Sequence, residues 1–514
     1  MPGAVELPDD IQSLKELVLT QRALLVSHQV QIEHLKLQIA RLRRAQYGRS
    51  SEQLNEQIAQ LEFTLEELET QEASVPEPLA TGPATRRKPV RRPLPEHLPR
   101  ERRVHEPAST CDCPRCGGSL RVLGEDVAEM LEYVPEHWKV LRHVRPKYSC
   151  SSCQHIVQAP APSRPIERSL AGPGLLAHVL VSKYADHLPL YRQSQIYARE
   201  RVEIDRSTLG EWVGGATALM DPLFGALSQY VLSAQKLHAD DTPVPVLAPG
   251  TGKTKTGRLW TYVRDDRPAG STDPPAVFFR YSPDRKGEHP VAHLQDYRGI
   301  LQADGYSGFN GLYDRKKDPL SEAACMAHAR RKYFDIFEST GSPIAKEAIE
   351  RIGALYAIEE QIRGQLPDQR RRVRQERSLP LLNDLHRWLR TTERQQPRKS
   401  DLAGAIHYSL ARWEALSRFC HDGRIEIDNN AAERAIRAVA LGRKNFLFAG
   451  ADCGGERAAA MYSLIGTCRL NNIDPEAYLR YVLGRIAEHP INRIEDLLPW
   501  NLAKELEQKP ALAA

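Results

Sequence analysis

The chain has 514 residues, of which 41% are hydrophobic and 27% charged. This length exceeds what one hydrophobic core can serve, so about three or four folding units are expected, and the composition excludes an intrinsically disordered chain. The formal net charge is only +5, so any argument for a nucleic-acid partner depends on where the positive charge lies rather than on its sum.

The sequence offers no signal for a membrane or for export. It contains no run of about eighteen consecutive apolar residues, which a spanning helix would need. The N-terminal stretch MPGAVELPDD has neither the basic start nor the apolar centre of a secretory signal. We therefore expect a cytoplasmic protein with no membrane partner.

Residues 1–72 show the seven-residue period of a coiled coil. Between residues 11 and 42, eight of the ten successive a and d positions are apolar, and Gln21 and His28 are the exceptions. We expect this region to join protomers into a homo-oligomer, although an amphipathic helix packed on its own chain would show the same stripe. A second apolar seam, in residues 54–68, would either fold back as a hairpin or continue the rod out of register.

Residues 73–107 are rich in proline and arginine and lack an apolar period. This composition predicts a linker that is stiffened by proline. Its positive charge is typical of a solvated segment, and an arm that follows DNA phosphates is the alternative.

The segment 108–160 contains two Cys-x-x-Cys pairs, separated by a stretch with strand character. Each pair can give two thiolates to a tetrahedral zinc ion, and two such pairs joined by strands predict a zinc ribbon. A redox-active pair is the alternative, which the coincidence of two pairs in one small module disfavours. Cys111 is a spare thiol or an alternative ligand. The predicted zinc ligands are Cys113, Cys116, Cys150 and Cys153.

Residues 161–232 predict a helical region. Two short helices flank the stretch RVEID, and the second would open on Ser207 or Thr208. This pattern is typical of a helix-turn-helix that binds DNA, and an ordinary helical packing element explains it equally well.

From residue 233 the pattern changes to short strands, in KLHADDTPVPVL, RLWTYVRDD and AVFFRYSP, followed by a helical EHPVAHLQDY and the strand of GILQADGYSGF. Three adjacent strands, a crossover helix and a fourth strand place the first strand beside the fourth, which is the topology of a ribonuclease-H-like fold. We expect this core in residues 233–480, with an arginine-rich helical insertion at about 340–425 and a C-terminal tail in 481–514. The whole chain is thus expected to be a multidomain α+β protein.

Two aspartates belong to neighbouring predicted strands. Asp240, on the first strand, and Asp304, at the end of the fourth, would face each other. Carboxylates this close repel unless a cation lies between them, and Mg²⁺ or Mn²⁺ accepts such oxygen ligands. Asp241 is the rival ligand, because successive strand residues point to opposite faces and only one of the pair can face the site.

Glu433 has two interpretations. It follows Asn430 by three residues and precedes an apolar run, which is the pattern of a helix-capping box. It is also a candidate third carboxylate beside Asp240 and Asp304. Such a triad can hold two metal ions about 3.5 to 4 Å apart, which assist in-line displacement at phosphorus.

These motifs resemble transposases of the insertion sequence 66 family, whose nuclease domain belongs to the DDE group. The matching stretches are LHADDTPVPVL, LQADGYSGFNGLY, AACMAHARRKYF, IDNNAAERAIRAVALGRKNFLFAG and the cysteine segments, and the resemblance covers nearly the whole chain. It implies that Asp240, Asp304 and Glu433 bind the catalytic Mg²⁺ or Mn²⁺. One departure is the first motif, where the family typically has Asp-Glu-Thr and this chain has Asp-Asp-Thr.

The resemblance also points to Cys325 and His328, which match a Cys-x-x-His element that follows the second aspartate in several transposase groups. A packing cysteine at a strand end and a solvated histidine are the alternative. Basic residues near these motifs are candidates for DNA contact: Arg330, Arg331, Lys332, Arg434, Arg437, Arg443 and Lys444.

The activity implied by the resemblance is hydrolysis at transposon ends, followed by attack of the freed 3′ hydroxyls on target DNA. DNA, further copies of the chain and accessory proteins of the same element are the implied partners. Two rival functions remain, a metal-dependent nuclease without strand transfer and a zinc-ribbon DNA-binding regulator without catalysis.

Overall fold

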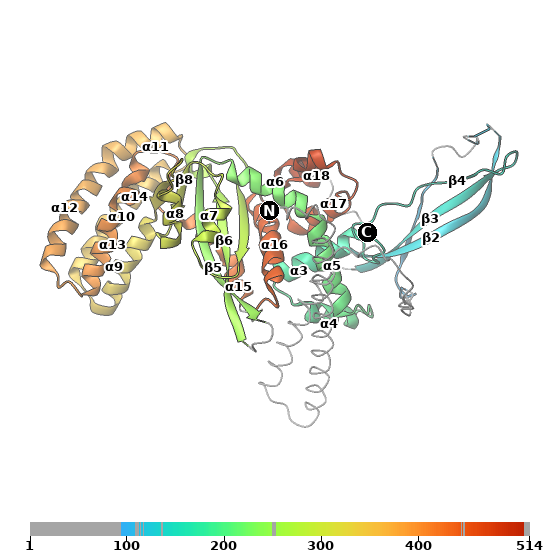
Figure 1. The fold of residues 1–514 in the computed structure, drawn as a ribbon, viewed down its shortest axis with the longest axis horizontal. Coiled ribbons are helices and arrows are strands. Elements are labelled where there is room, and N and C mark those ends of the chain that lie inside the picture. The colour runs from blue at the N-terminus through green and yellow to red at the C-terminus, as the bar shows by residue number, and fades with distance from the viewer. Residues whose placement is uncertain are drawn as a thin grey trace, which may run out of the picture.

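The computed structural model describes residues 94–107, 113, 115, 116, 118–134, 137–248, 253–443, 445 and 448–507. The predicted coiled coil of residues 1–72, Cys111 and Lys444 lie outside this part of the chain. Figure 1 shows a block of helices, a central sheet with helices packed beside it, and a long β-hairpin that projects from the opposite end. Among the described helices, none is both long enough and apolar enough to span a membrane.

The central sheet has five strands in the order β7-β6-β5-β8-β9. The first three along the chain are antiparallel neighbours, whereas β8 runs parallel to both β5 and β9. The first predicted strand therefore lies beside the fourth, as expected, and β9 is an additional strand that the sequence did not indicate. The strands are β5 (Lys236–Ala248), β6 (Lys253–Arg264), β7 (Ala276–Ser282), β8 (Ile300–Ala303) and β9 (Ser321–Ala324), with α7 (Glu288–His293) before β8.

The two faces of β5 have different neighbours. Leu237 and Ala239 are fully buried in the main hydrophobic core on one face. On the other face lies α15 (Asn430–Gly442), whose Ala432 and Val439 pack with residues of β6. Because side chains alternate along a strand, the residue Asp240 belongs to the face that carries α15.

The main core unites the sheet with helices from both ends of the described chain. Residues predicted as a separate helical region and as a C-terminal tail share this core, because their apolar side chains pack on α16 and on one another. The segment from 481 to 507 is therefore folded rather than a tail. The helices are α3 (Pro173–Tyr184), α4 (Leu190–Arg199), α5 (Arg206–Leu219), α6 (Asp221–Leu232), α16 (Asp452–Leu470), α17 (Pro475–Leu483) and α18 (Pro499–Glu507), with a 3₁₀ segment at Ile491–Leu497.

The pair α4 and α5 occupies the predicted helix-turn-helix. The second helix begins at Arg206 after Asp205, one residue before the predicted Ser207. It buries Leu209, Trp212 and Val213 in the main core. Burial on this scale is the behaviour of a packing element, and the DNA-binding role of this pair stays a prediction.

The helical insertion forms a core of its own against β9. It begins at Met326, earlier than the predicted residue 340, because α9 continues directly from the end of β9. Within the insertion, Arg374 binds both carboxylate oxygens of Glu359, at 2.8 and 2.6 Å. A buried ion pair ties the insertion to the segment before α15, because Arg370 lies 2.8 Å from Glu426. Its helices are α9 (Met326–Thr340), α10 (Pro343–Ile362), α11 (Pro367–Val373), α12 (Leu379–Gln395), α13 (Asp401–Ala411) and α14 (Trp413–Ser417).

The projecting hairpin consists of β2 (Leu120–Val134) and β3 (His137–Cys150), with β4 (Ile156–Gln158) and β1 (Arg100–Val104) paired to β3. The prediction that the linker extends to residue 107 is therefore wrong. Strand β1 is held by backbone pairing with β3, which requires no apolar period in its sequence.

One end of the hairpin docks on the main core through a buried carboxylate. Glu132 accepts hydrogen bonds from the N–H groups of Tyr133 and Leu175, at 3.0 and 2.7 Å, and so satisfies the start of α3. Side chains at Gly172 or Gly174 would collide with this carboxylate, since a Cβ atom there would lie 2.6 or 2.4 Å from its oxygens. The cysteine end of the hairpin points away from the core (Figure 1).

Candidate acidic active site and cysteine cluster

Four cysteine sulfur atoms meet at the free end of the hairpin, all within 4.8 Å of one another. The Sγ of Cys113 lies 3.5 Å from that of Cys153, and the Sγ of Cys116 lies 3.4 Å from Cys150 and 3.2 Å from Cys153. A tetrahedral zinc ion with bonds of about 2.3 Å separates its sulfur ligands by about 3.8 Å, so this donor set fits Zn²⁺.

Backbone groups favour a thiolate at this cluster. The N–H groups of Ser152 and Cys153 lie 3.4 and 3.5 Å from the Sγ of Cys150. Their hydrogen bonds, that of Cys153 foremost, lower the pKa of Cys150 to about 6. A thiolate is the form that binds zinc, so the fold prepares this ligand before the metal arrives.

Asp240 lies within β5, and Asp304 directly follows the neighbouring strand β8. His238 on β5 is paired in register with Gln302 on β8, and each aspartate follows its partner by two residues. Burial raises the pKa of Asp240 to about 7, and the negative charges of Asp304 and Glu433 add to the shift. The three carboxylates therefore interact electrostatically in the absence of any cation, as expected for a metal-binding site.

Asp241, the rival ligand, points to the opposite face of β5. Its side chain is only 2% exposed and forms ion pairs with Arg258 at 3.0 Å and Arg285 at 2.8 Å. Two guanidinium groups already neutralise this carboxylate, so the geometry favours Asp240 as the candidate ligand.

The capping interpretation of Glu433 fails on helix register. The N-cap of α15 is Asn429 rather than Asn430, which places Glu433 one position beyond the capping-box site. The N–H of Asn429 lies 3.1 Å from the Sγ of Cys325, and the N–H of Asn430 is bound by Asp428 at 3.1 Å. The Glu433 carboxylate has no part in either contact and is 40% exposed.

Among the described residues, the potential metal ligands closest to Glu433 are Cys325 and His328, and not Asp240 or Asp304. Groups of three or more ligand atoms within 4.8 Å comprise the four cysteines, a surface cluster at Asp284, and the set Cys325, His328 and Glu433. The Nδ1 of His328 lies 3.6 Å from the Glu433 carboxylate. The structure thus brings the Cys-x-x-His element to Glu433 and leaves the triad of Asp240, Asp304 and Glu433 outside this distance.

A cavity of about 530 Å³ opens beside Glu433. His328, Arg330, Arg331 and Phe334 from α9 form part of its wall. The combination of guanidinium groups, an exposed aromatic ring and a carboxylate is suited to a nucleic-acid strand.

Comparison with known proteins agrees with these features. A profile of the family described as "Transposase IS66 family" matches residues 168–457, which is more than half of the chain. The chain belongs to the IS66 transposase family. Its predicted membership is thereby confirmed, and the matched range contains Asp240, Asp304 and Glu433.

Other IS66 regions lie on either side of this range. Residues 34–103 match a profile described as "Transposase C of IS166 homeodomain", residues 110–154 match the "zinc-finger binding domain of transposase IS66", and residues 463–500 match the "IS66 C-terminal element". The cysteine cluster falls within the zinc-finger match, which supports Zn²⁺ as its ligand.

Two relatives of this IS66 chain come from Sinorhizobium fredii. The uncharacterized protein y4hP is 45% identical and the match covers 93% of this chain and 90% of the relative. The uncharacterized protein y4qI is 37% identical, with 96% and 98% covered. Similarity therefore extends over nearly the whole length of these proteins.

The basic residues proposed from the sequence fall into different settings in this IS66 chain. Arg330 and Arg331 line the cavity, and Arg434 lines the adjoining one. Arg443 donates to the carbonyl of Pro243 at 3.0 Å, so its guanidinium has a structural partner. Arg437 is exposed on α15, and Lys332 lies over the ring of Tyr408 at 4.6 Å.

Sequence reasoning missed three buried polar residues of the IS66 core, His238, Gln302 and Asn429. A signal was present: the two strands share the pattern Leu-polar-Ala-Asp, as LHAD in residues 237–240 and LQAD in residues 301–304. A polar residue at the same position in two buried strands indicates a shared partner, because buried polar groups need hydrogen bonds.

Proposed function

We propose that this IS66 chain is a DDE-type DNA transposase that uses Asp240, Asp304 and Glu433 as ligands of divalent metal ions. The observation that carries the proposal is the placement of Asp240 within β5 beside Asp304, which directly follows the adjacent parallel strand β8, with α15 packed on the face of the sheet that carries Asp240. This sheet order also supports assignment of the core to the ribonuclease-H-like folds.

The donor set fits Mg²⁺ or Mn²⁺. All three proposed ligands are carboxylates, and the raised pKa of Asp240 reflects its burial and, to a smaller extent, the negative charges of Asp304 and Glu433. When bound, the metal ions would activate an attacking oxygen and neutralise the charge that develops on the leaving one.

The chain's own residues position the DNA. Arg330 and Arg331 bind phosphates along the cavity, and Phe334 offers a surface for a base. His328 is placed to orient the Glu433 carboxylate. The cysteine ribbon, held apart from this site by the hairpin, contacts transposon ends, and the N-terminal coiled coil pairs protomers so that two ends are processed together.

The proposed reaction has two displacements at phosphorus. In the first, water attacks a phosphodiester at the transposon end, a P–O bond to water forms as the bond to the 3′ oxygen breaks, and the 3′ hydroxyl is released. In the second, that hydroxyl attacks a target phosphodiester and displaces another 3′ oxygen. Neither displacement requires a covalent intermediate with the protein.

Joining of a labelled transposon-end duplex to a plasmid tests the proposal. Purified zinc-loaded protein with Mg²⁺ or Mn²⁺ should produce joined products, and Asp240→Asn, Asp304→Asn and Glu433→Gln should each lower the yield by about 1,000-fold or more. Asp384→Asn is the matched control, since it removes an exposed carboxylate that pairs with Arg351 in the insertion.

The alternatives give distinct results. Cleavage without joining would identify a nuclease. DNA binding with no cleavage, under conditions in which the coiled-coil region and accessory proteins are present, would identify a non-catalytic regulator. Full activity of Glu433→Gln alone would exclude Glu433 from the triad.

A further inference from the structure

The segment Glu426–Asn429 immediately precedes α15. It lies far along the chain from Asp240 and Asp304, yet it must set where Glu433 stands relative to them. Its contacts come from β5, β8 and the end of β9, which are the elements that carry the site.

Asn429 joins this segment to the strand of Asp240. Its Nδ2 donates to the carbonyl of Ala239 at 2.8 Å, and its Oδ1 lies 3.0 Å from the Nδ1 of His238. Because a carbonyl can only accept, Nδ2 faces Ala239, and Oδ1 must accept from the Nδ1–H of His238. Asn429 is 0% and His238 1% exposed, so water cannot replace these bonds.

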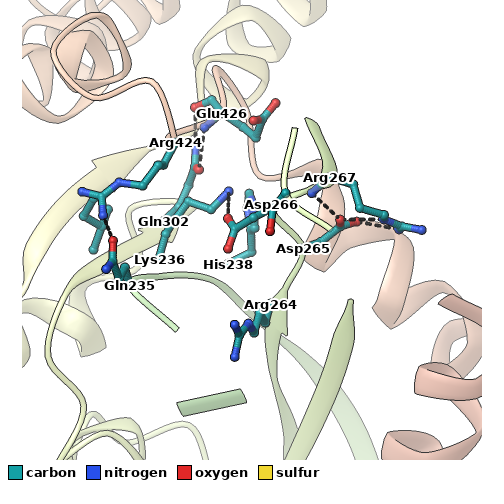
Figure 2. Close-up of polar contacts among 12 residues, drawn as sticks. Gln235, Lys236, His238, Arg264, Asp265, Asp266, Arg267, Gln302, Arg424 and Glu426 are labelled. Carbon is teal, nitrogen blue, oxygen red and sulfur yellow. Dashed lines mark hydrogen bonds and ion pairs between the residues drawn. The ribbon is translucent and has the colours of Figure 1, made fainter. Parts of the chain in front are cut away.

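Gln302 joins the same segment to the strand of Asp304. Its Nε2 donates to the carbonyl of Glu426 at 2.6 Å, and its Oε1 accepts from the N–H of Glu426 at 3.3 Å. Figure 2 shows these two contacts beside Lys236 and His238. The side-chain amide of Gln302 thus pairs with both the N–H and the carbonyl of Glu426, as a neighbouring strand would. These two hydrogen bonds fix the position of the segment relative to β8.

The end of β9 supplies the third attachment. The N–H of Met326 donates to the carbonyl of Ile427 at 3.0 Å, and the N–H of Asn429 lies on the sulfur of Cys325 at 3.1 Å. The carboxylate of Glu426 is held by Arg370 of the insertion at 2.8 Å. The segment is thus attached to β5, to β8, to the end of β9 and to the insertion before α15 begins.

We propose that His238, Gln302 and Asn429 are positioning residues that hold Glu433 in register with Asp240 and Asp304. His238 lies two residues before Asp240, and Gln302 lies two residues before Asp304. Each of them binds the segment Glu426–Asn429 at a point close to the aspartate that follows it. This inference rests on the proposed function for its catalytic consequence, while the mechanical linkage can be measured without any reaction.

Hydrogen–deuterium exchange of backbone amides tests the linkage directly. Asn429→Ala removes both side-chain bonds, and Gln302→Met keeps the side-chain volume while removing its bonds to Glu426. Both variants should exchange at least about tenfold faster in residues 426–436, with the rest of the sheet unchanged. The matched control is Asn471→Ala, because Asn471 also donates to two backbone carbonyls, of Pro275 and Thr467 at 2.8 Å, but lies at the C-terminal end of α16, away from the tested segment.

Manganese binding and kinetics test the consequence. In Asn429→Ala, Mn²⁺ binding measured by calorimetry on zinc-loaded protein should weaken by about tenfold or more. The cleavage kcat should fall by about 100-fold while KM for DNA changes less than about threefold, because the proposed phosphate contacts Arg330 and Arg331 lie on α9, outside the loosened segment. Asn471→Ala should match the wild type in both measurements.

The outcomes separate the two hypotheses. If exchange, Mn²⁺ binding and kcat of Asn429→Ala and Gln302→Met equal those of Asn471→Ala, the positioning role is overturned. If the wild type shows no Mn²⁺ binding that Asp240→Asn removes, the proposed function is overturned, and the exchange data alone still decide whether these residues hold α15.

Discussion

The cysteine cluster and the acidic site are assembled in different ways by the same chain. Two knuckles close in sequence to the ends of one hairpin bring four sulfur atoms to within 3.2 to 3.5 Å for the pairs in contact. The three carboxylates come instead from β5, from the end of β8 and from α15, and their oxygen atoms do not converge in the same way. A local turn fixes the first site, and tertiary packing fixes the second.

This difference has an electrostatic counterpart. At the cysteine site, backbone N–H donors lower the pKa of Cys150, whereas hydrogen bonds with Cys153 and Cys150 raise the pKa of Cys116 to about 12. At the acidic site, burial and, to a smaller extent, the neighbouring carboxylates raise the pKa of Asp240. The first site thus has one ligand already in its zinc-binding form, and the second gains most when a cation binds.

The largest effect is expected from breaking the local site. Cys150→Ser should abolish zinc binding, since structural zinc contributes about 10 to 16 kcal/mol of binding free energy in small domains. The core should stay folded, because the cluster lies at the free end of the hairpin. Metal analysis with thermal unfolding measures both, and Cys453→Ser is the control outside the cluster. Collapse of the whole chain would show that the two sites are not separable.

The next effect concerns the attachment between the two regions. Glu132→Ala leaves the buried N–H groups of Tyr133, Gly174 and Leu175 without their acceptor, which should cost about 2 to 3 kcal/mol in docking of the hairpin. Faster proteolysis between hairpin and core would report it.

Glu125→Ala is the control for this attachment. Glu125 is 46% exposed and pairs with Arg102, which is 60% exposed, on the part of the hairpin away from the core, so its loss should cost less than about 0.5 kcal/mol. Equal proteolysis rates for the two variants would show that Glu132 does not secure the hairpin.

A smaller effect sharpens the electrostatic contrast. The folded state raises the pKa of Asp240 from 3.8 to about 7, so folding free energy is lost as the pH rises from about 4 to about 7 and changes little above that range. Asp240→Asn should therefore stabilise protein free of Mg²⁺ and Mn²⁺ by about 1 to 2 kcal/mol near pH 8, and by less than half of that near pH 5. Urea unfolding at both pH values measures it. A variant that is less stable than the wild type near pH 8 would show that ionised Asp240 does not destabilise the folded protein.

The smallest effect is expected at the cavity wall. Arg331→Gln should weaken DNA binding a fewfold and reduce the slope of log affinity against log salt by about one, as expected for one lost phosphate contact. Arg387→Gln, on the exposed surface of the insertion with a 79% exposed side chain, serves as the control. An unchanged salt slope in Arg331→Gln would remove this residue from the DNA path.

The sequence anticipated elements whose signals are local. Alternation identified β5 and placed Asp240 and Asp241 on opposite faces, and the Cys-x-x-Cys pairs located the sulfur cluster. Strand β1 escaped prediction because its stability comes from pairing with β3, and β9 has only four residues, in Ser321–Ala324. The capping interpretation failed by one residue, since a run of polar residues at 428–430 gives several equivalent N-cap candidates.

The contacts of Asn429 could not be predicted from a single sequence. Its partners His238 and Ala239 lie about 190 residues earlier in the chain, and no local pattern records that pairing. Packing of the insertion and the strands determines it. The repeated Leu-polar-Ala-Asp pattern predicts that a partner exists without indicating which residue it is.

The docked hairpin also holds the cysteine cluster at a fixed distance from the core. Trp138 packs edge to face on Tyr197 at the core, and β3 then runs without a break to the zinc-ligand position Cys150. At about 3.4 Å per residue, this stretch carries the cysteines about 40 Å outward. That span equals about twelve base pairs of duplex. Under the proposed contact of the ribbon with transposon ends, the length of the hairpin would place that contact roughly one helical turn of DNA beyond the core.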